Sequence, residues 1–242
     1  MKKIFFIILF ISSSLLYGTT INVGFIISPP YAVYADDDKK HFYGFTVDLM
    51  DEICKRINVD CVYKPITLNT ELAELQNGTI ELAFTQIPIT SDATGNYLFS
   101  LPYLISDGQF VTLSENKINT ASDLKSKRIG VLTDTLYQIL LNSNYSDEQI
   151  TQYSNFSDMV SGLENNQIDA IFINNHLAHY MIYNVSLGIK MIGNQVPIGE
   201  GYGILGLQTN KALIDKVNTA LLSMESDGTY LNLYTLYFGE DK

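Results

Sequence analysis

Two carboxamide side chains, Gln86 and Asn174, occupy the same position in two copies of one sequence unit. Residues 71–86 and 159–174 align with each other without a gap, and each copy has the pattern of a helix, a polar turn and a short apolar strand that ends on the carboxamide. A carboxamide both donates and accepts hydrogen bonds, which suits recognition of a neutral polar group. The repeat therefore predicts paired lobes whose polar strand ends face a shared cleft.

Further side chains suited to ligand contact lie on loops that follow predicted strands. In open α/β sheets, ligands bind beyond the carboxyl ends of the strands. The loops concerned span residues 27–34, 85–90, 133–137 and 174–176. Besides the two carboxamides, we predict ligand contacts from Tyr31, Ile87, Pro88, Thr90, Thr133, Asp134, Thr135 and Tyr137.

The segment Thr133-Asp134-Thr135 precedes a predicted helix and suits two kinds of ligand group. Backbone N–H groups at a helix start carry partial positive charge and can hold an anion, which Asp134 would oppose. Asp134 could instead pair with a cationic ligand group or lie exposed. The rings of Tyr31 and Tyr137 can stack on a ligand, and for Tyr137 a packing role is the alternative.

The first 18 residues have the composition of a secretory signal peptide, with Lys2 and Lys3 followed by an apolar run over residues 4–11. We therefore predict an exported, periplasmic protein whose mature chain starts near residue 19. Without the two lysines, 13 basic side chains remain against 26 acidic ones, a net charge of −13. This balance argues against nucleic acid or an anionic membrane as partner.

The chain contains only two cysteines, Cys54 and Cys61. An exported protein meets an oxidising compartment, so we predict one disulfide between them. It would join the end of a predicted helix to the start of the next strand. The alternatives are two buried free thiols or a metal-binding pair, and the second lacks nearby histidine or cysteine partners.

Strand and helix patterns alternate from residue 20 and start again near residue 128, which indicates two βαβαβ halves. In the first half we predict strands over residues 21–26, 61–64 and 80–85 and helices over 47–57 and 70–76. In the second half we predict strands over residues 128–132, 150–153 and 168–173, a helix over 135–141, and the helix of the repeat. A strand over residues 202–207 and helices over 211–225 and 231–238 close the chain.

Several short motifs occur in a specific order along the mature chain. They are Pro29-Pro-Tyr-Ala, Gly44-Phe-Thr-Val-Asp-Leu, the Cys-x6-Cys pair, Phe99-Ser, Ser122-Asp-Leu-Lys-Ser-Lys-Arg-Ile-Gly-Val, Ile168-Asp-Ala and Asp227-Gly-Thr-Tyr. In this order the chain resembles the bacterial extracellular solute-binding proteins of family 3, the polar-amino-acid receptors of ABC importers.

The resemblance implies a two-lobed α/β periplasmic binding protein fold of the type II kind, with two Rossmann-like lobes joined by two crossover strands around a ligand cleft. It implies a first lobe made of residues 19–106 and 204–242, and a second lobe made of residues 107–203. It also implies a monomer that closes on a small polar ligand, presents the closed form to an inner-membrane ABC permease, and needs no cofactor.

The sequence departs from the family at both expected ligand anchors. The family's arginine, which clamps a ligand carboxylate through its guanidinium fork, aligns with Ala93, and no Lys, Arg or His occurs between Pro65 and Asn116. The family's acidic residue, which pairs with a ligand ammonium, aligns with Asn174. Both opposite charges that hold a zwitterion are missing, so the ligand need not be an ordinary α-amino acid.

Two other function classes follow from the same residues. A sensor would pass its closed state to a membrane partner other than a permease. A dehydratase-type enzyme on this fold would need an acid or base in the cleft, for which the loops offer Asp134, His176 and Glu200 but no arginine. His176 and His179 are three residues apart without a further ligand nearby, so we predict no metal site.

Overall fold

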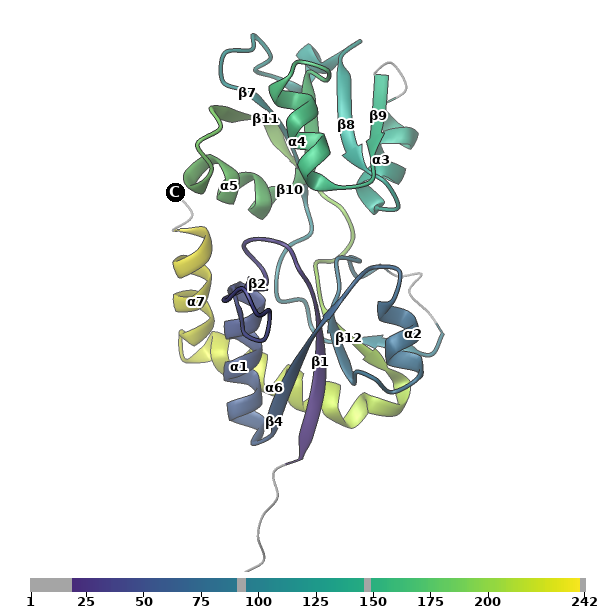
Figure 1. Cartoon of the computed structure of the whole chain (residues 1–242), viewed down its shortest axis with the longest axis vertical. Helices are drawn as coiled ribbons and strands as arrows, with labels where there is room; N and C mark the ends of the chain where they lie inside the picture. Colours follow the sequence, from purple (N-terminus) through teal and green to yellow (C-terminus); the bar gives the residue numbers. More distant parts are fainter. Residues whose placement is uncertain (1–18, 91–94, 146–148, 240–242) are drawn as a thin grey trace, which may run out of the picture.

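The computed structural model describes residues 19–90, 95–145 and 149–239. Within these ranges the chain forms two five-stranded sheets, one in each lobe (Figure 1). The first sheet has the strand order β4-β1-β5-β12-β6, and the second has the order β11-β7-β10-β8-β9. Each sheet therefore belongs to one half of the molecule, and a strand from the end of the chain completes the first.

The first lobe combines the N-terminal part of the chain with its C-terminal helices. β1 (Thr20–Ile26) pairs in parallel with β4 (Asp60–Ile66) and β5 (Leu82–Phe84), and β12 (Ile204–Leu207) pairs antiparallel with β5 and with β6 (Tyr97–Phe99). The helices of this lobe are α1 (Phe45–Ile57), α2 (Glu71–Gln76), α6 (Lys211–Ser226) and α7 (Thr229–Phe238), with a short hairpin of β2 (Val33–Tyr34) and β3 (Phe42–Tyr43) and a 3₁₀ turn η2 (Gln208–Asn210).

The second lobe is built from one continuous stretch of chain. Its strands are β7 (Gly108–Leu113), β8 (Arg128–Leu132), β9 (Gln149–Tyr153), β10 (Ala170–Asn174) and β11 (Ile189–Val196). Its helices are α3 (Leu136–Asn144), α4 (Phe156–Glu164) and α5 (Asn175–Asn184), with a 3₁₀ turn η1 (Ala121–Leu124). Strand β8 coincides with the predicted strand, whereas the pattern did not predict β7, which pairs antiparallel with β10 and β11 in the interior of the sheet.

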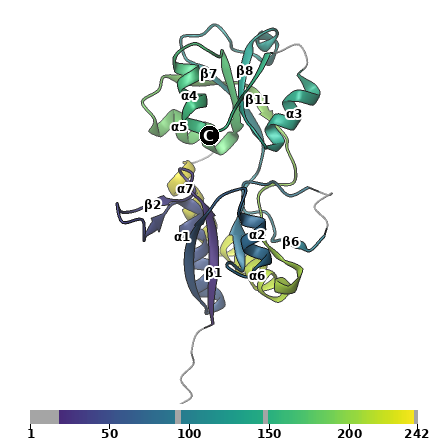
Figure 2. The same cartoon turned by 45° about the vertical axis from the view of Figure 1, so that its right-hand side comes forward.

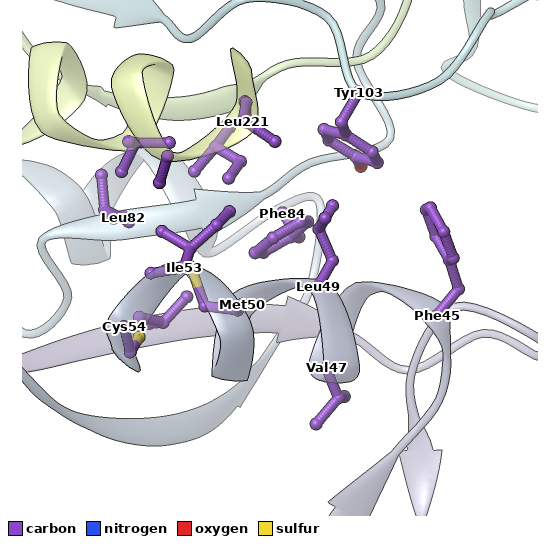
Figure 3. Packing of buried hydrophobic residues seen from close by; sticks show 14 of the residues in the cluster. Phe45, Val47, Leu49, Met50, Ile53, Cys54, Leu82, Phe84, Tyr103 and Leu221 are labelled. Atoms are coloured by element: carbon purple, nitrogen blue, oxygen red, sulfur yellow. The ribbon is translucent and has the colours of Figure 1, made fainter. Parts of the chain in front are cut away.

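Helix α1 illustrates how the sequence forms the core of the first lobe (Figure 3). Its apolar residues Phe45, Leu49, Met50 and Ile53 recur at helical spacing, and each is fully buried. The helix ends at Asn58, which adopts a left-handed conformation with φ 57°.

The disulfide between Cys54 and Cys61 confirms the predicted pairing. It joins the last turn of α1 to the start of β4, and the two Cα atoms are 6.2 Å apart. The cross-link therefore holds this helix against the edge strand of the first sheet.

Two crossing segments connect the lobes (Figure 1). Tyr103 donates its backbone N–H to the carbonyl of Tyr202, and Tyr202 donates its own to the carbonyl of Leu104. Leu104 and Tyr202 form an antiparallel bridge. The two segments therefore cross as a pair, which confirms the predicted two-lobed architecture with two crossovers.

A second contact between the lobes lies beside these segments, where α7 meets α5 (Figures 1 and 2). The buried ring of His176 lies 5.0 Å from the ring of Phe238 and 5.6 Å from the ring of Tyr234, between centroids. In the part of the chain that the structure describes, no helix combines the length and apolar character needed to cross a membrane.

Candidate functional site

A cavity of about 290 Å³ lies between the two lobes. Its wall comes from strand-end loops of both halves and from the crossover segments, as the strand-end rule predicts. Two buried phenylalanines, Phe84 and Phe172, occupy equivalent positions of the repeat, and both line the cavity. The remaining wall residues are Ile26, Ile27, Ser28, Tyr31, Thr46, Leu68, Thr85, Gln86, Tyr103, Leu104, Leu132, Thr133, Thr135, Tyr137, Ser154, Asn155, Phe156, Ile173, Asn174, Leu177 and Tyr202.

A cluster of hydroxyl and carboxamide groups connects the two lobes at this cavity. Tyr31 donates its hydroxyl to Asn174 Oδ1 at 2.9 Å, across a sequence separation of 143 residues. Asn174 Nδ2 donates to the hydroxyl of Tyr137 at 3.2 Å. The Tyr137 hydroxyl in turn donates to the carbonyl of Ser106 at 3.0 Å and lies 2.6 Å from the hydroxyl of Tyr202. The cluster therefore joins both lobes and both crossover segments.

The tyrosines of this cluster remain neutral at physiological pH. Burial raises the pKa of Tyr31 and Tyr202 well above the ordinary value and raises that of Tyr137 to about 12. Their hydroxyls therefore act as hydrogen-bonding groups without adding charge to the cavity.

Asn174 uses most of its hydrogen-bonding capacity within the protein. It is the N-cap of α5, and its Oδ1 accepts from the backbone N–H groups of His176 and Leu177 at 2.9 and 3.3 Å. The same oxygen accepts from Tyr31, and Nδ2 donates to Tyr137. The predicted ligand anchor thus lies in the cavity wall but is already committed to the fold and to the other lobe.

Gln86, the equivalent residue of the first copy, differs from Asn174. Its half-buried side chain lines the cavity and makes no hydrogen bond to another described residue. Thr85, just before it, fixes the local turn, because its hydroxyl accepts from the backbone N–H of Ile87 at 3.0 Å. The first copy therefore presents a carboxamide that is available to a ligand.

A buried carboxyl group supports this turn from behind the cavity wall. Thr85 donates its hydroxyl to Glu71 Oε1 at 3.0 Å, whereas Glu71 Oε2 has no hydrogen-bond partner among the described residues. Glu71 is 0% exposed, and its burial raises the pKa to about 7. The second copy has the apolar pair Met159 and Ile173 at these two positions, both buried.

The structure separates the predicted contact residues into two groups. Tyr31, Gln86, Thr133, Thr135, Tyr137 and Asn174 line the cavity, whereas Ile87, Pro88, Thr90 and Asp134 do not. Ile87 is exposed, and Pro88 is buried where a side chain added at Gly199 would contact it. Asp134, at φ 60°, is exposed outside the wall.

Sequence reasoning missed several wall residues, and two groups of them are instructive. Ser154, Asn155 and Phe156 follow β9 and begin α4. The strand-end rule would have found them, had it been applied to the weak strand that was predicted there. Tyr103 and Tyr202 lie in the crossover segments, next to the predicted lobe boundaries, but neither tyrosine was predicted as a ligand contact.

The acids, bases and arginines that the enzyme alternative would need do not line this cavity. His176 is buried against α7, and Glu200 is exposed. Arg56 pairs with Glu52 and Asp227 at 2.8 Å each, so its guanidinium contributes to contacts within the first lobe. The other arginine, Arg128, pairs with Asp169 at 2.8 Å in the second lobe.

Among the residues that the structure describes, one group of side chains has ligand atoms close enough for a metal ion. Asp36, Asp38 and His41 have such atoms within 4.8 Å of one another, on the loop between β2 and β3. Asp36 pairs with His41, and Asp38 pairs with Lys40 at 2.9 Å. Both carboxylates are therefore paired with side chains of the same loop.

Comparison with known proteins identifies the protein family. Residues 21–240 match the model of the bacterial extracellular solute-binding proteins, family 3. The chain belongs to this family. Family 3 consists of solute-binding proteins rather than enzymes, so the dehydratase alternative is rejected.

The relatives of this family 3 protein are periplasmic amino-acid-binding proteins. The L-cystine-binding protein TcyJ of Escherichia coli is 29% identical over 88% of this chain and 80% of its own length. The arginine-binding periplasmic protein of Mannheimia haemolytica is 26% identical over 93% of this chain and 97% of its own. A solved arginine transport system periplasmic binding protein from Legionella pneumophila superimposes with a TM-score of 0.81 at 34% identity, covering 91% of this chain and all of its own.

Proposed function

We propose that this protein is the periplasmic binding component of an ABC importer and that it captures a small polar solute, an amino acid or a similar compound, by closure of the two lobes. The observation that carries the proposal is the cavity between two lobes that are joined by two crossing segments. Its volume of about 290 Å³ is near the lower end of the roughly 300–1,000 Å³ typical of small-molecule sites.

Closure would move residues 107–203 against residues 19–106 and 204–242. The ligand would then contact Tyr31, Gln86 and Thr85 from the first lobe and Thr133, Thr135 and Tyr137 from the second, all of which line the cavity. Asn174 would contact it only by giving up a bond within the protein, since its carboxamide oxygen already accepts three hydrogen bonds.

The proposed capture proceeds without the arginine that clamps a carboxylate in this family. Ala93, which aligns with that arginine, lies outside the described residues. Among the residues that the structure describes, no Lys, Arg or His lines the cavity. The absence of a cation from this wall and the neutral residue at position 93 together support this part of the proposal.

The remaining features of the proposal follow from the family and the N-terminal sequence. Residues 1–18, predicted as a signal peptide, lie outside the described residues. The proposed mature protein is a periplasmic monomer that docks on an inner-membrane permease in its closed form. Relatives named as periplasmic proteins that match more than nine tenths of the chain support this location.

A thermal-shift screen tests the proposal on the mature protein. A ligand that binds only the native state increases the free energy of unfolding, by about 2.7 kcal/mol at a hundredfold excess over Kd. The melting temperature rises as a result. We expect at least one amino acid or amino-acid derivative to do so and to reduce the radius of gyration in small-angle X-ray scattering. A ligand that stabilises without compaction would contradict the closure. Docking on a membrane partner other than a permease would favour the sensor.

A further inference from the structure

The wall of the cavity is uncharged over the part of the chain that the structure describes. Its polar groups are hydroxyls and carboxamides, and its tyrosines stay protonated because burial raises the pKa of each. Residues 91–94, outside the described ranges, have the sequence Ser-Asp-Ala-Thr and contain no basic side chain. Neither source supplies a cation that could neutralise a bound carboxylate.

The rest of the molecule offers no substitute cation from an arginine. The chain has two arginines, Arg56 and Arg128, and both are held by carboxylates in ion pairs of 2.8 Å. Neither side chain lines the cavity. An ionised ligand group would lose its hydration on entering this wall without meeting a side chain of opposite charge, which is unfavourable.

The two copies of the repeat offer different hydrogen-bonding groups. Asn174 is engaged by Tyr31, by Tyr137 and by the first turn of α5. Gln86 makes no hydrogen bond to another described residue, so both its carbonyl oxygen and its NH₂ group can serve a ligand. A donor and an acceptor side by side match an amide or a hydroxyl, which also donates and accepts.

The wall around Gln86 is mainly apolar. Phe84 and Phe172 line the cavity from equivalent positions of the two copies, and Leu68, Leu132 and Phe156 also line it. Such a wall gains free energy by covering hydrocarbon or an aromatic ring. The cavity is therefore suited to a compound with one polar end and an apolar body.

From this wall we infer that the ligand is an uncharged compound with an amide or hydroxyl group that pairs with Gln86 and an apolar body that packs between Phe84 and Phe172. The inference rests on the proposed receptor function and specifies its substrate class. It distinguishes this protein from relatives whose names are those of cystine- and arginine-binding proteins.

Charge variants of one compound test the inference directly. For leucine, phenylalanine and glutamine, four forms are titrated by calorimetry into the mature protein: the free amino acid, its amide, the N-acetyl acid and the N-acetyl amide. These forms are zwitterionic, cationic, anionic and neutral at pH 7, and each series keeps one side chain. We expect the neutral N-acetyl amide to bind at least about tenfold more tightly than each of the other three forms, a difference of about 1.4 kcal/mol.

Three variants assign the effect to Gln86. Gln86→Ala should weaken binding of the neutral form about tenfold, since it removes up to two hydrogen bonds. Gln86→Glu should shift the preference to the cationic amide. The control Gln76→Ala, in the helix of the same copy, removes an exposed glutamine that bonds to Tyr97 outside the cavity and should leave affinity unchanged.

The outcomes separate this inference from the proposed function. Tightest binding of the free amino acid, of the anion or of the cation would overturn the uncharged-ligand inference and leave the receptor function standing. An unchanged Kd in Gln86→Ala would overturn the role of Gln86. If circular dichroism confirms a folded protein and no form of any series binds, both the inference and the proposed function would be overturned.

Discussion

Replacing the buried Glu71 by glutamine should stabilise the protein strongly at pH 8 and much less at pH 5. Glu71 is 0% exposed, one of its oxygens lacks a partner among the described residues, and its pKa is raised from 4.5 to about 7. The folded protein therefore holds this proton more tightly than the unfolded chain does. The contribution of Glu71 to stability is therefore greatest below pH 4.5 and is lost as the pH rises towards 7 and above.

The magnitude follows from the pKa difference. Each pKa unit corresponds to about 1.4 kcal/mol, so ionisation of Glu71 costs about 3 kcal/mol of folding free energy at pH 8. Glutamine keeps an oxygen that can accept from Thr85, as Oε1 of Glu71 does at 3.0 Å, and carries no charge. Glu71→Gln therefore removes the cost of the charge while keeping this contact.

Urea denaturation at pH 5, 6, 7 and 8 measures the effect. The stability difference between Glu71→Gln and the wild type should rise from about 1 kcal/mol at pH 5 to about 3 kcal/mol at pH 8. Comparing the two proteins at each pH cancels groups with the opposite slope, such as Asp169, whose pKa is lowered by Arg128. The exposed Glu164→Gln on α4 is the control and should show no such rise. A difference that stays constant with pH would refute the reasoning about Glu71.

Three further substitutions test the fold and the link between the lobes. Tyr31→Phe removes the hydrogen bond to Asn174 across the cavity and should shift the unliganded protein towards an open form by about 1 kcal/mol, or about fivefold, seen as a larger radius of gyration; an unchanged radius would contradict it. Gly108→Ala places a methyl group 2.2 Å from the ring of the buried Phe172 and should cost about 1–3 kcal/mol of stability in urea; a neutral result would show that the ring can move aside. Cys54→Ser opens the disulfide and should cost about 2 kcal/mol for its short loop, an effect that should disappear when wild type and variant are compared in reducing agent.

The sequence was sufficient to predict features that depend on local pattern and repetition. The two copies ending at Gln86 and Asn174 correctly indicated two lobes with a sheet each, and Cys54 and Cys61, close together in a chain predicted to be exported, indicated the disulfide. Strand β7 was missed because an antiparallel strand inserted between the halves breaks the alternating βα pattern that served as the guide.

The state of each side chain at the site required the three-dimensional structure. Gln86 and Asn174 are equivalent in sequence, and only the folded structure shows that Asn174 is engaged, by the distant Tyr31 and Tyr137 and by its own helix, whereas Gln86 is not. The burial of Glu71 likewise depends on packing between α2, β5 and β12, which a charged residue in a helix does not signal.

The duplicated origin of the cavity wall has a consequence for how a ligand is oriented. Two identical copies facing each other would offer the same groups to both ends of a bound molecule, and a molecule could then sit in either direction. Here the carboxamide of Asn174 caps its own helix and bonds to the opposite lobe, whereas the carboxamide of Gln86 makes no such bond. That difference makes the two ends of the cavity chemically unequal, so we expect an unsymmetrical solute to bind in a single orientation.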